Sequence, residues 1–137
     1  MRIPVSRWLP ALAALTIVTF AWGCSSNTTE TASLDSSPLH VSFSTTPPST
    51  VKVGDQVTIT VTVSQNGKPV EDAKDVTFEV WKEKQDQHEM IKANKNGDGV
   101  YSIPYTFRQE GTYFIMYHVT ARDQHSMQKM ELKVSKR

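Results

Sequence analysis

Apolar and polar residues alternate with a period of two along most of the chain after residue 38, and this pattern restricts the possible folds more than any other feature. In the stretch 57–63 the valines and the isoleucine occupy one face, while threonines occupy the other. The same alternation recurs in 39–43, 76–80, 101–107, 113–119 and 130–134. A strand with this pattern buries one face and exposes the other. The sequence therefore predicts an all-β domain.

Turn signals separate these stretches at the spacing typical of a β-sandwich. Glycine-containing or proline-containing turns are expected at 47–48, 54–55, 66–67 and 96–99. A short edge strand is expected around Met90 and Ile91. Tyr113, two residues after Gly111, is typical of the tyrosine corner of immunoglobulin-like sandwiches. About seven strands within residues 38–137, without a helix, predict an immunoglobulin-like Greek-key β-sandwich.

Residues 1–23 have the features of a secretory signal that is removed. Two arginines precede an apolar run over residues 8–22, which is shorter than the roughly 20 residues that span a bilayer as a permanent helix. The segment 19–26 resembles a bacterial lipobox, with Gly23 directly before Cys24. By that resemblance Cys24 becomes the lipid-modified first residue of a lipoprotein. The alternatives are an ordinary secretory signal that ends near a cysteine and an uncleaved anchor.

Residues 24–37 form the predicted tether, and a single domain is expected at 38–137. The stretch 25–37 is rich in serine and threonine and has one large apolar residue, Leu34. It cannot bury enough surface to offset its ordering entropy. Two or three acyl chains on Cys24 would make membrane anchoring stable. We therefore expect a protein that is lipid-anchored on the extracytoplasmic face of the cell membrane.

Charge and residue content argue against two broad classes of function. The chain carries 15 Lys and Arg against 14 Asp and Glu, and two of the arginines fall in the signal. A mature protein with a net charge near zero has no field that gathers phosphates, so nucleic-acid binding is not expected. The one cysteine, Cys24, allows no intrachain disulfide, and no Gly-x-Ser-x-Gly nucleophile motif is present. We therefore expect a protein that is not an enzyme.

Imidazole and thioether ligands are concentrated near the end of the predicted domain. Met116, His118, His125 and Met127 lie within 12 consecutive residues. Period two places them on the outer faces of two successive strands. A hairpin loop within 120–123 would set His118 opposite His125 and Met116 opposite Met127. Two imidazoles and two thioethers form a soft ligand set that suits copper, so these four residues are the predicted metal site.

Other interpretations of these side chains stay open. His118 and His125 could be solvated strand and loop residues, with the methionines packed against aromatic rings. Met130 is expected to face the core and is left out of the site. A second His-x-Met pair, His88 and Met90, lies in a weakly patterned segment and is more readily explained as part of the surface.

Several short motifs resemble the YtkA-like family, which is similar to the FixH proteins of bacterial respiratory operons. Together they run through nearly the whole predicted domain. In chain order they are Val53-Gly54-Asp55, the loop segment 67–73, the strand 76–80, the segment 99–101, Gly111-Thr112-Tyr113, His118-Val119 and His125. The order of the motifs and the segment from His118 to His125 carry the resemblance.

The resemblance implies a small extracytoplasmic domain of the kind found in lipoproteins of Gram-positive bacteria, with a link to copper delivery or terminal-oxidase assembly. The expected function is a non-catalytic binding module that handles copper near respiratory or envelope complexes. Its expected partners are the membrane, through the lipid anchor, and an envelope or respiratory protein. The alternative is a metal-free interaction or structural module of the cell envelope, which would hold a partner through a sheet face.

Overall fold

The computed structural model describes residues 37–48 and 50–137, which form ten β-strands. They are β1 (His40–Thr46), β2 (Val51–Lys52), β3 (Gln56–Gln65), β4 (Lys68–Pro69), β5 (Asp75–Lys82), β6 (Glu89–Lys92), β7 (Asn94–Gly97), β8 (Val100–Thr106), β9 (Gly111–Ala121) and β10 (Gln124–Ser135). In this part of the chain no helix is long and apolar enough to cross a membrane. The predicted signal, Cys24 and the tether up to residue 36 lie outside the described residues.

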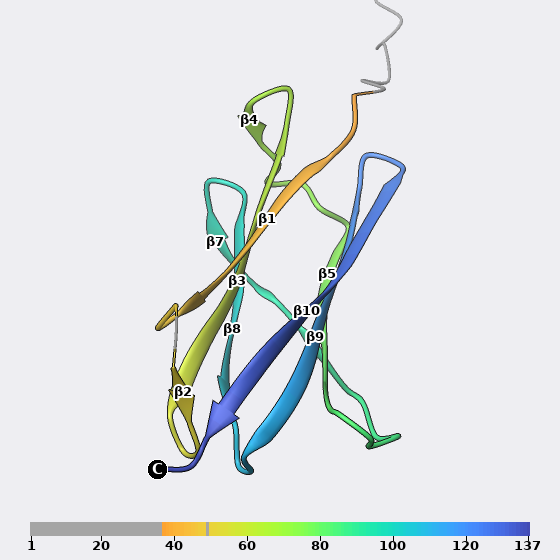
Figure 1. The fold of residues 1–137 in the computed structure, drawn as a ribbon. Helices are drawn as coiled ribbons and strands as arrows, with labels where there is room; N and C mark the ends of the chain where they lie inside the picture. The colour runs from red at the N-terminus through yellow and green to blue at the C-terminus, as the bar shows by residue number, and fades with distance from the viewer. Residues whose placement is uncertain (1–36, 49) are drawn as a thin grey trace, which may run out of the picture. The chain divides into compact units, whose positions relative to one another are not determined.

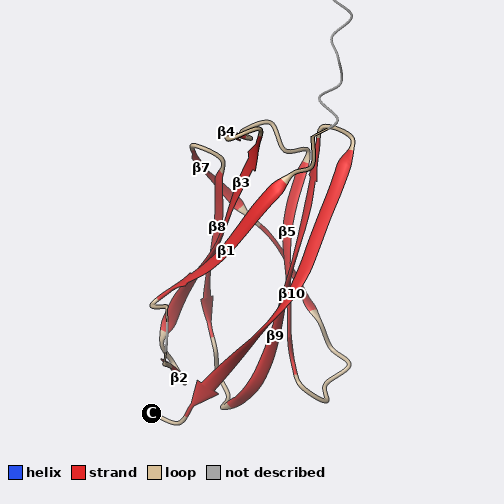
Figure 2. Cartoon of the chain, turned by 45° about the horizontal axis from the view of Figure 1, so that its top comes forward, coloured by secondary structure: helices blue, strands red, loops and turns tan. Residues whose placement is uncertain are grey.

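The ten strands form two sheets (Figure 1; Figure 2). One has the order β1–β3–β8–β7, with β4 paired to β3, and the other has the order β2–β10–β9–β5–β6. An immunoglobulin-type sandwich places strands A, B, E and D in one sheet and C, F and G in the other. Here β1, β3, β8 and β7 take the first set of positions, and β5, β9 and β10 take the second. The predicted immunoglobulin-like Greek-key β-sandwich is confirmed.

The residues that alternate in the sequence form the core between the two sheets. Valines and the isoleucine at 57–63 are fully buried in β3, and every second residue of β9 from Tyr113 to Ala121 is buried. Full burial of an aliphatic or aromatic side chain of this size contributes roughly 1.5–3 kcal/mol. Leu39, Met130 and Leu132 are partly buried against this core. The inward-facing rows that the period of two predicts are confirmed.

Tyr113 lies at the corner where the chain passes from β8 to β9. Its side chain is buried, and its ring packs edge-on against Phe107, with the ring centroids 4.8 Å apart. Its hydroxyl donates a hydrogen bond to the carbonyl of Gln109, four residues upstream, at 3.2 Å. Burial raises the pKa of this hydroxyl. These contacts are the features of a tyrosine corner, so this prediction is confirmed as well.

Three short strands are additions to the prediction. β2 and β4 have two residues each and β7 has four, so none is long enough to show a period in the sequence. The edge strand expected around Met90 and Ile91 is β6.

Pro104 in β8 lies beyond Ser102, where the pairing with β7 ends. Its missing N–H therefore breaks no ladder on that side of the strand.

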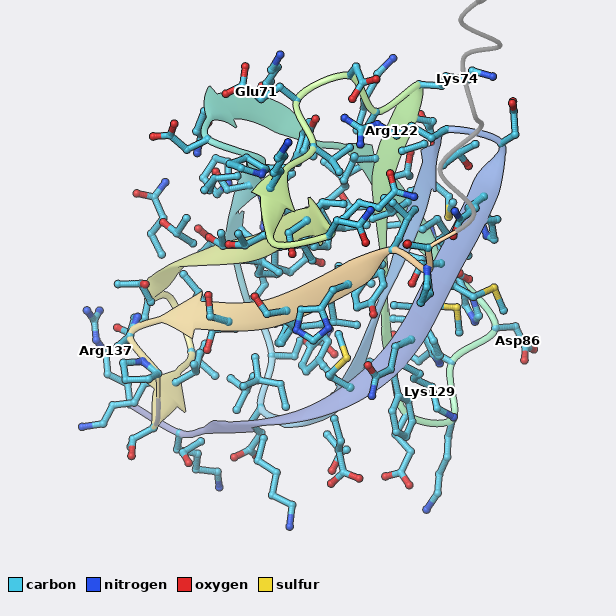
Figure 3. The ribbon with its side chains drawn as sticks, turned by 90° about the horizontal axis from the view of Figure 1, so that it is seen from above. Glu71, Lys74, Asp86, Arg122, Lys129 and Arg137 are labelled. Atoms are coloured by element: carbon cyan, nitrogen blue, oxygen red, sulfur yellow. The ribbon has the colours of Figure 1, made fainter. Side chains whose placement is uncertain are left out.

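A two-residue turn, Arg122-Asp123, joins β9 to β10. Both residues have positive φ, 50° and 60°, which non-glycine residues seldom adopt. Contacts with the loop before β5 hold the turn: Arg122 pairs with Asp72 at 3.2 Å, and Asp123 pairs with Lys74 at 2.9 Å. The hydrogen bond from Arg122 lowers the pKa of Asp72. In the view from above in Figure 3, the labels of Arg122 and Lys74 lie on the same side of the domain.

Ser37, which directly precedes the domain predicted from the sequence, is hydrogen-bonded to both sheets. Its carbonyl accepts hydrogen bonds from the side-chain amides of Gln65 at 2.6 Å and Gln124 at 2.8 Å. The buried apolar residues of the described chain all lie between Val51 and Val134. The compact unit Ser33–Arg137 thus encloses its own core and can fold independently. A fragment for solution experiments should begin at Ser33, so that Ser37 is retained.

Candidate metal-binding face

Ligand-type side chains gather on the outer face of the second sheet. β10, β9, β5 and β6 lie next to one another in that order, and β10, β9 and β5 can be followed side by side in Figure 1. The strand phase points one set of residues to the core and the alternate set outward. The outward set includes His125 and Met127 on β10, Met116 and His118 on β9, Glu79 on β5, and Met90 on β6.

His118 is the central residue of this group. Met127 lies directly across from it on β10, and Met116 precedes it by two residues on the same face of β9. The predicted pairing of His118 with His125, and of Met116 with Met127, is therefore wrong by two residues. The reason is that the strands stay paired up to the turn at Arg122-Asp123, which is tighter and later than the loop that the sequence suggested.

The two histidine rings are close in spite of the changed register. The ring centroids of His118 and His125 are 5.9 Å apart, and the ring planes are inclined by 36°. Two imidazoles that bind one ion through metal–nitrogen bonds of about 2 Å leave a gap of this order between their rings. His125 Nδ1 is also 3.0 Å from the hydroxyl oxygen of Thr120, which leaves its Nε2 for other contacts.

Glu79 on β5 bridges His118 and His88. Its Oε2 is 2.9 Å from Nε2 of His118, and its Oε1 is 2.5 Å from Nδ1 of His88. The hydrogen bond from His88, followed by that from His118, lowers the pKa of Glu79 below its usual value. An ionised carboxylate only accepts hydrogen bonds, so each ring donates an N–H to Glu79, and the metal-binding form of each ring is the tautomer with its single proton on that nitrogen. The other nitrogen, Nδ1 of His118 and Nε2 of His88, keeps a lone pair that can bind a metal.

Sequence reasoning missed Glu79 and set His88 apart from the predicted site. His88 lies on the same outer face, because its ring stacks on that of Trp81 with centroids 4.4 Å apart and planes inclined by 12°. The period of two does place Glu79 and Trp81 on one face of β5. The sequence pattern does not give the order of the strands in the sheet. Only the pairing of β5 with β9 and β6 brings Glu79 between the two histidines.

The donors on this face suit a soft metal. Among the residues that the structure describes, no three His, Cys, Asp or Glu side chains are grouped so as to hold one ion. An ion bound here would therefore take thioether ligands in addition to imidazole, and that combination suits copper better than zinc. Met127 is 56% exposed, so this residue is accessible to an ion in solution. The donor set of His118, His125, Met116 and Met127 is thus compatible with copper.

Strand order, tyrosine corner and buried rows together define an immunoglobulin-like β-sandwich domain, with histidine and methionine side chains on the outer face of one sheet. The model of the YtkA-like family matches residues 34–118. This protein belongs to the YtkA-like family. The matched residues end at His118, so β10, which carries His125 and Met127, lies beyond them.

Comparison with solved structures gives several matches at low sequence identity. An engineered protein has a TM-score of 0.54 and 17% identity, with 72% of this chain and 20% of that chain covered. The endo-β-1,4-mannanase from Thermotoga petrophila has a TM-score of 0.53 and 13% identity, with 75% and 21% covered. The superoxide reductase (neelaredoxin) from Ignicoccus hospitalis has a TM-score of 0.49 and 10% identity, with 71% and 82% covered.

The chain spans about a fifth of the length of the first two of these proteins. At such low identity, these two similarities support the sandwich fold and nothing beyond it. A comparison with the curated proteins gives no match. Any function must therefore be argued from the residues of this chain.

Proposed function

We propose that this protein is a lipid-anchored, extracytoplasmic module that binds copper close to the membrane through His118 and His125, assisted by Met116 and Met127. The single observation that carries the proposal is the gathering of these four side chains on one outer sheet face, with the two imidazole rings 5.9 Å apart. Binding rather than catalysis is the proposed activity. The partner that receives or supplies the copper would be a respiratory or envelope protein.

Glu79 supports the proposal through its effect on His118. A carboxylate that accepts the N–H of a ligating histidine fixes its tautomer and orients its ring, and it also raises the basicity of the nitrogen that faces the metal. Glu79 meets His118 at 2.9 Å, and its side chain is only 18% exposed. The contact is therefore shielded from water better than one between two fully exposed side chains.

The proposal is tested by titrating the fragment 33–137 with Cu(I) without oxygen and with Cu(II) in air. We expect at least one oxidation state to bind with a dissociation constant tighter than about 10 µM. Zn(II) should bind more weakly, because zinc sites more usually include cysteine or carboxylate ligands. If neither copper ion binds this tightly, the copper proposal fails, and a metal-free interaction module becomes the better account.

The proposed lipid anchor at Cys24 can be tested separately from copper binding. The variant Cys24→Ala should not be processed as a lipoprotein and should take up no radioactive fatty acid, because the thiol that carries the diacylglyceryl group is absent. The neighbouring variant Ser26→Ala is the matched control and should be labelled like the parent. Labelling is measured on the protein after expression in a Gram-positive host. Equal labelling of Cys24→Ala and the parent would rule out lipidation at this residue.

A further inference from the structure

Two strands of the outer sheet face, and the segment that leads into a third strand, each carry a histidine and a methionine two residues apart. These pairs are His125 with Met127 and Met116 with His118, both within the proposed site, and His88 with Met90 at the edge strand β6. Residues at i and i+2 of a strand share one face; His88 directly precedes β6, and its contacts with Trp81 and Glu79 place it on the same face. The proposed copper site uses the first two pairs and leaves the third without a role.

His88 is held in place by two contacts. Its ring stacks on Trp81, and its Nδ1 is bonded to Oε1 of Glu79. Met90 lies directly across from Glu79 in the pairing of β6 with β5, and it is 59% exposed. A groove of about 860 Å³, lined in part by His88, Met90 and Tyr105, gives solvent access to this edge of the sheet.

We propose that His88 and Met90 form a second position for a soft metal ion, on the opposite side of Glu79 from His118. The direction of the unprotonated nitrogen on each histidine ring requires two separate metal positions. Each ring donates its N–H to the same carboxylate, so its remaining nitrogen faces away from Glu79. One ion cannot meet both lone pairs while Glu79 accepts from both rings. Imidazole with thioether is again the set that suits Cu(I), a choice that rests on the proposed function.

Trp81 provides a built-in reporter of the second position. The chain has three tryptophans, and Trp81 is the only one within the fragment 33–137. Its ring is stacked on His88 with centroids 4.4 Å apart. An ion bound to His88 should therefore quench the emission of Trp81 strongly, while an ion bound to His118 and His125 should quench it less.

The test is an anaerobic titration of the fragment 33–137 with Cu(I) against a chromophoric chelator, together with the emission of Trp81. We expect two equivalents to bind to the parent and one to His88→Ala. Met90→Leu should weaken the second equivalent at least tenfold and reduce the quenching, while it preserves the stacking of His88 on Trp81. In His118→Ala the quenching should persist, because the second position is intact.

Four outcomes separate this inference from the proposed function. One bound equivalent that is lost in His118→Ala and unaffected by Met90→Leu would overturn the second position and leave the first. Two equivalents that persist in the double variant His88→Ala with Met90→Leu would also overturn it. A parent that binds no Cu(I) would overturn the second position, and it would overturn the proposed function as well only if Cu(II) also fails to bind more tightly than about 10 µM. A single equivalent that survives in His118→Ala but is lost in Met90→Leu would support the second position and refute the first.

Discussion

Replacing Tyr113 by alanine should lower the free energy of unfolding of the fragment 33–137 by about 3–5 kcal/mol, the range found for truncation of a buried aromatic ring. Tyr113 is 8% exposed, and its ring packs edge-on against that of Phe107. The substitution removes this packing, leaves a cavity at the corner between β8 and β9, and deprives the carbonyl of Gln109 of its donor. Urea unfolding followed by circular dichroism measures the change.

Tyr113→Phe separates the ring from the hydroxyl. It keeps the packing and removes only the hydrogen bond to Gln109, so we expect a loss of about 1 kcal/mol. Phe114→Ala, the next position along β9, is a control on the outer face, where the ring lies against Trp81 rather than in the core. A loss below about 1 kcal/mol for Tyr113→Ala would contradict the core position of this ring.

Replacing His118 by alanine should weaken copper binding more than any other single substitution in the proposed site, by at least tenfold or about 1.4 kcal/mol. The reason is its central place: Met127 lies across from it, His125 has its ring centroid 5.9 Å away, and Glu79 accepts its N–H. Competition with a chromophoric chelator measures the affinity, and urea unfolding of each variant shows whether the domain is still folded.

His118→Ala, His125→Ala and the variant with both substitutions form a double-mutant cycle for copper affinity. Two ligands of one ion act as a unit, so the double variant should lose less affinity than the sum of the single losses. His40→Ala is the matched control, since His40 is exposed on β1 in the other sheet. Additive losses, or an equal loss in His40→Ala, would show that His118 and His125 do not share an ion.

The faces of the strands could be predicted from the sequence because side-chain direction is a local property. A period of two in β9 was enough to place Tyr113 in the core and both Met116 and His118 on the outer face. The same argument set Met130 inward and Met127 outward on β10. Burial of one face against the other sheet is strongly favourable, so a pattern of this kind has one stable orientation.

The register between β9 and β10 could not be predicted in the same way. A shift by two residues keeps every side chain on its face, so the apolar pattern does not distinguish the predicted pairing from the observed one. The turn decides between them, and Arg122-Asp123 has no glycine to mark it. Its positive φ values are held by pairing with Asp72 and Lys74, which are about 50 residues away in the chain.

Local periodicity and turn residues in the sequence thus determined the all-β class, the strand faces and the tyrosine corner at Tyr113, because each depends on residues close together in the chain. Only the tertiary structure decided that β5 lies between β9 and β6, and so that Glu79 accepts hydrogen bonds from His118 and His88. Strand order depends on how the two sheets pack against a shared core. This packing involves residues far apart in the chain, so no local sequence pattern predicts it.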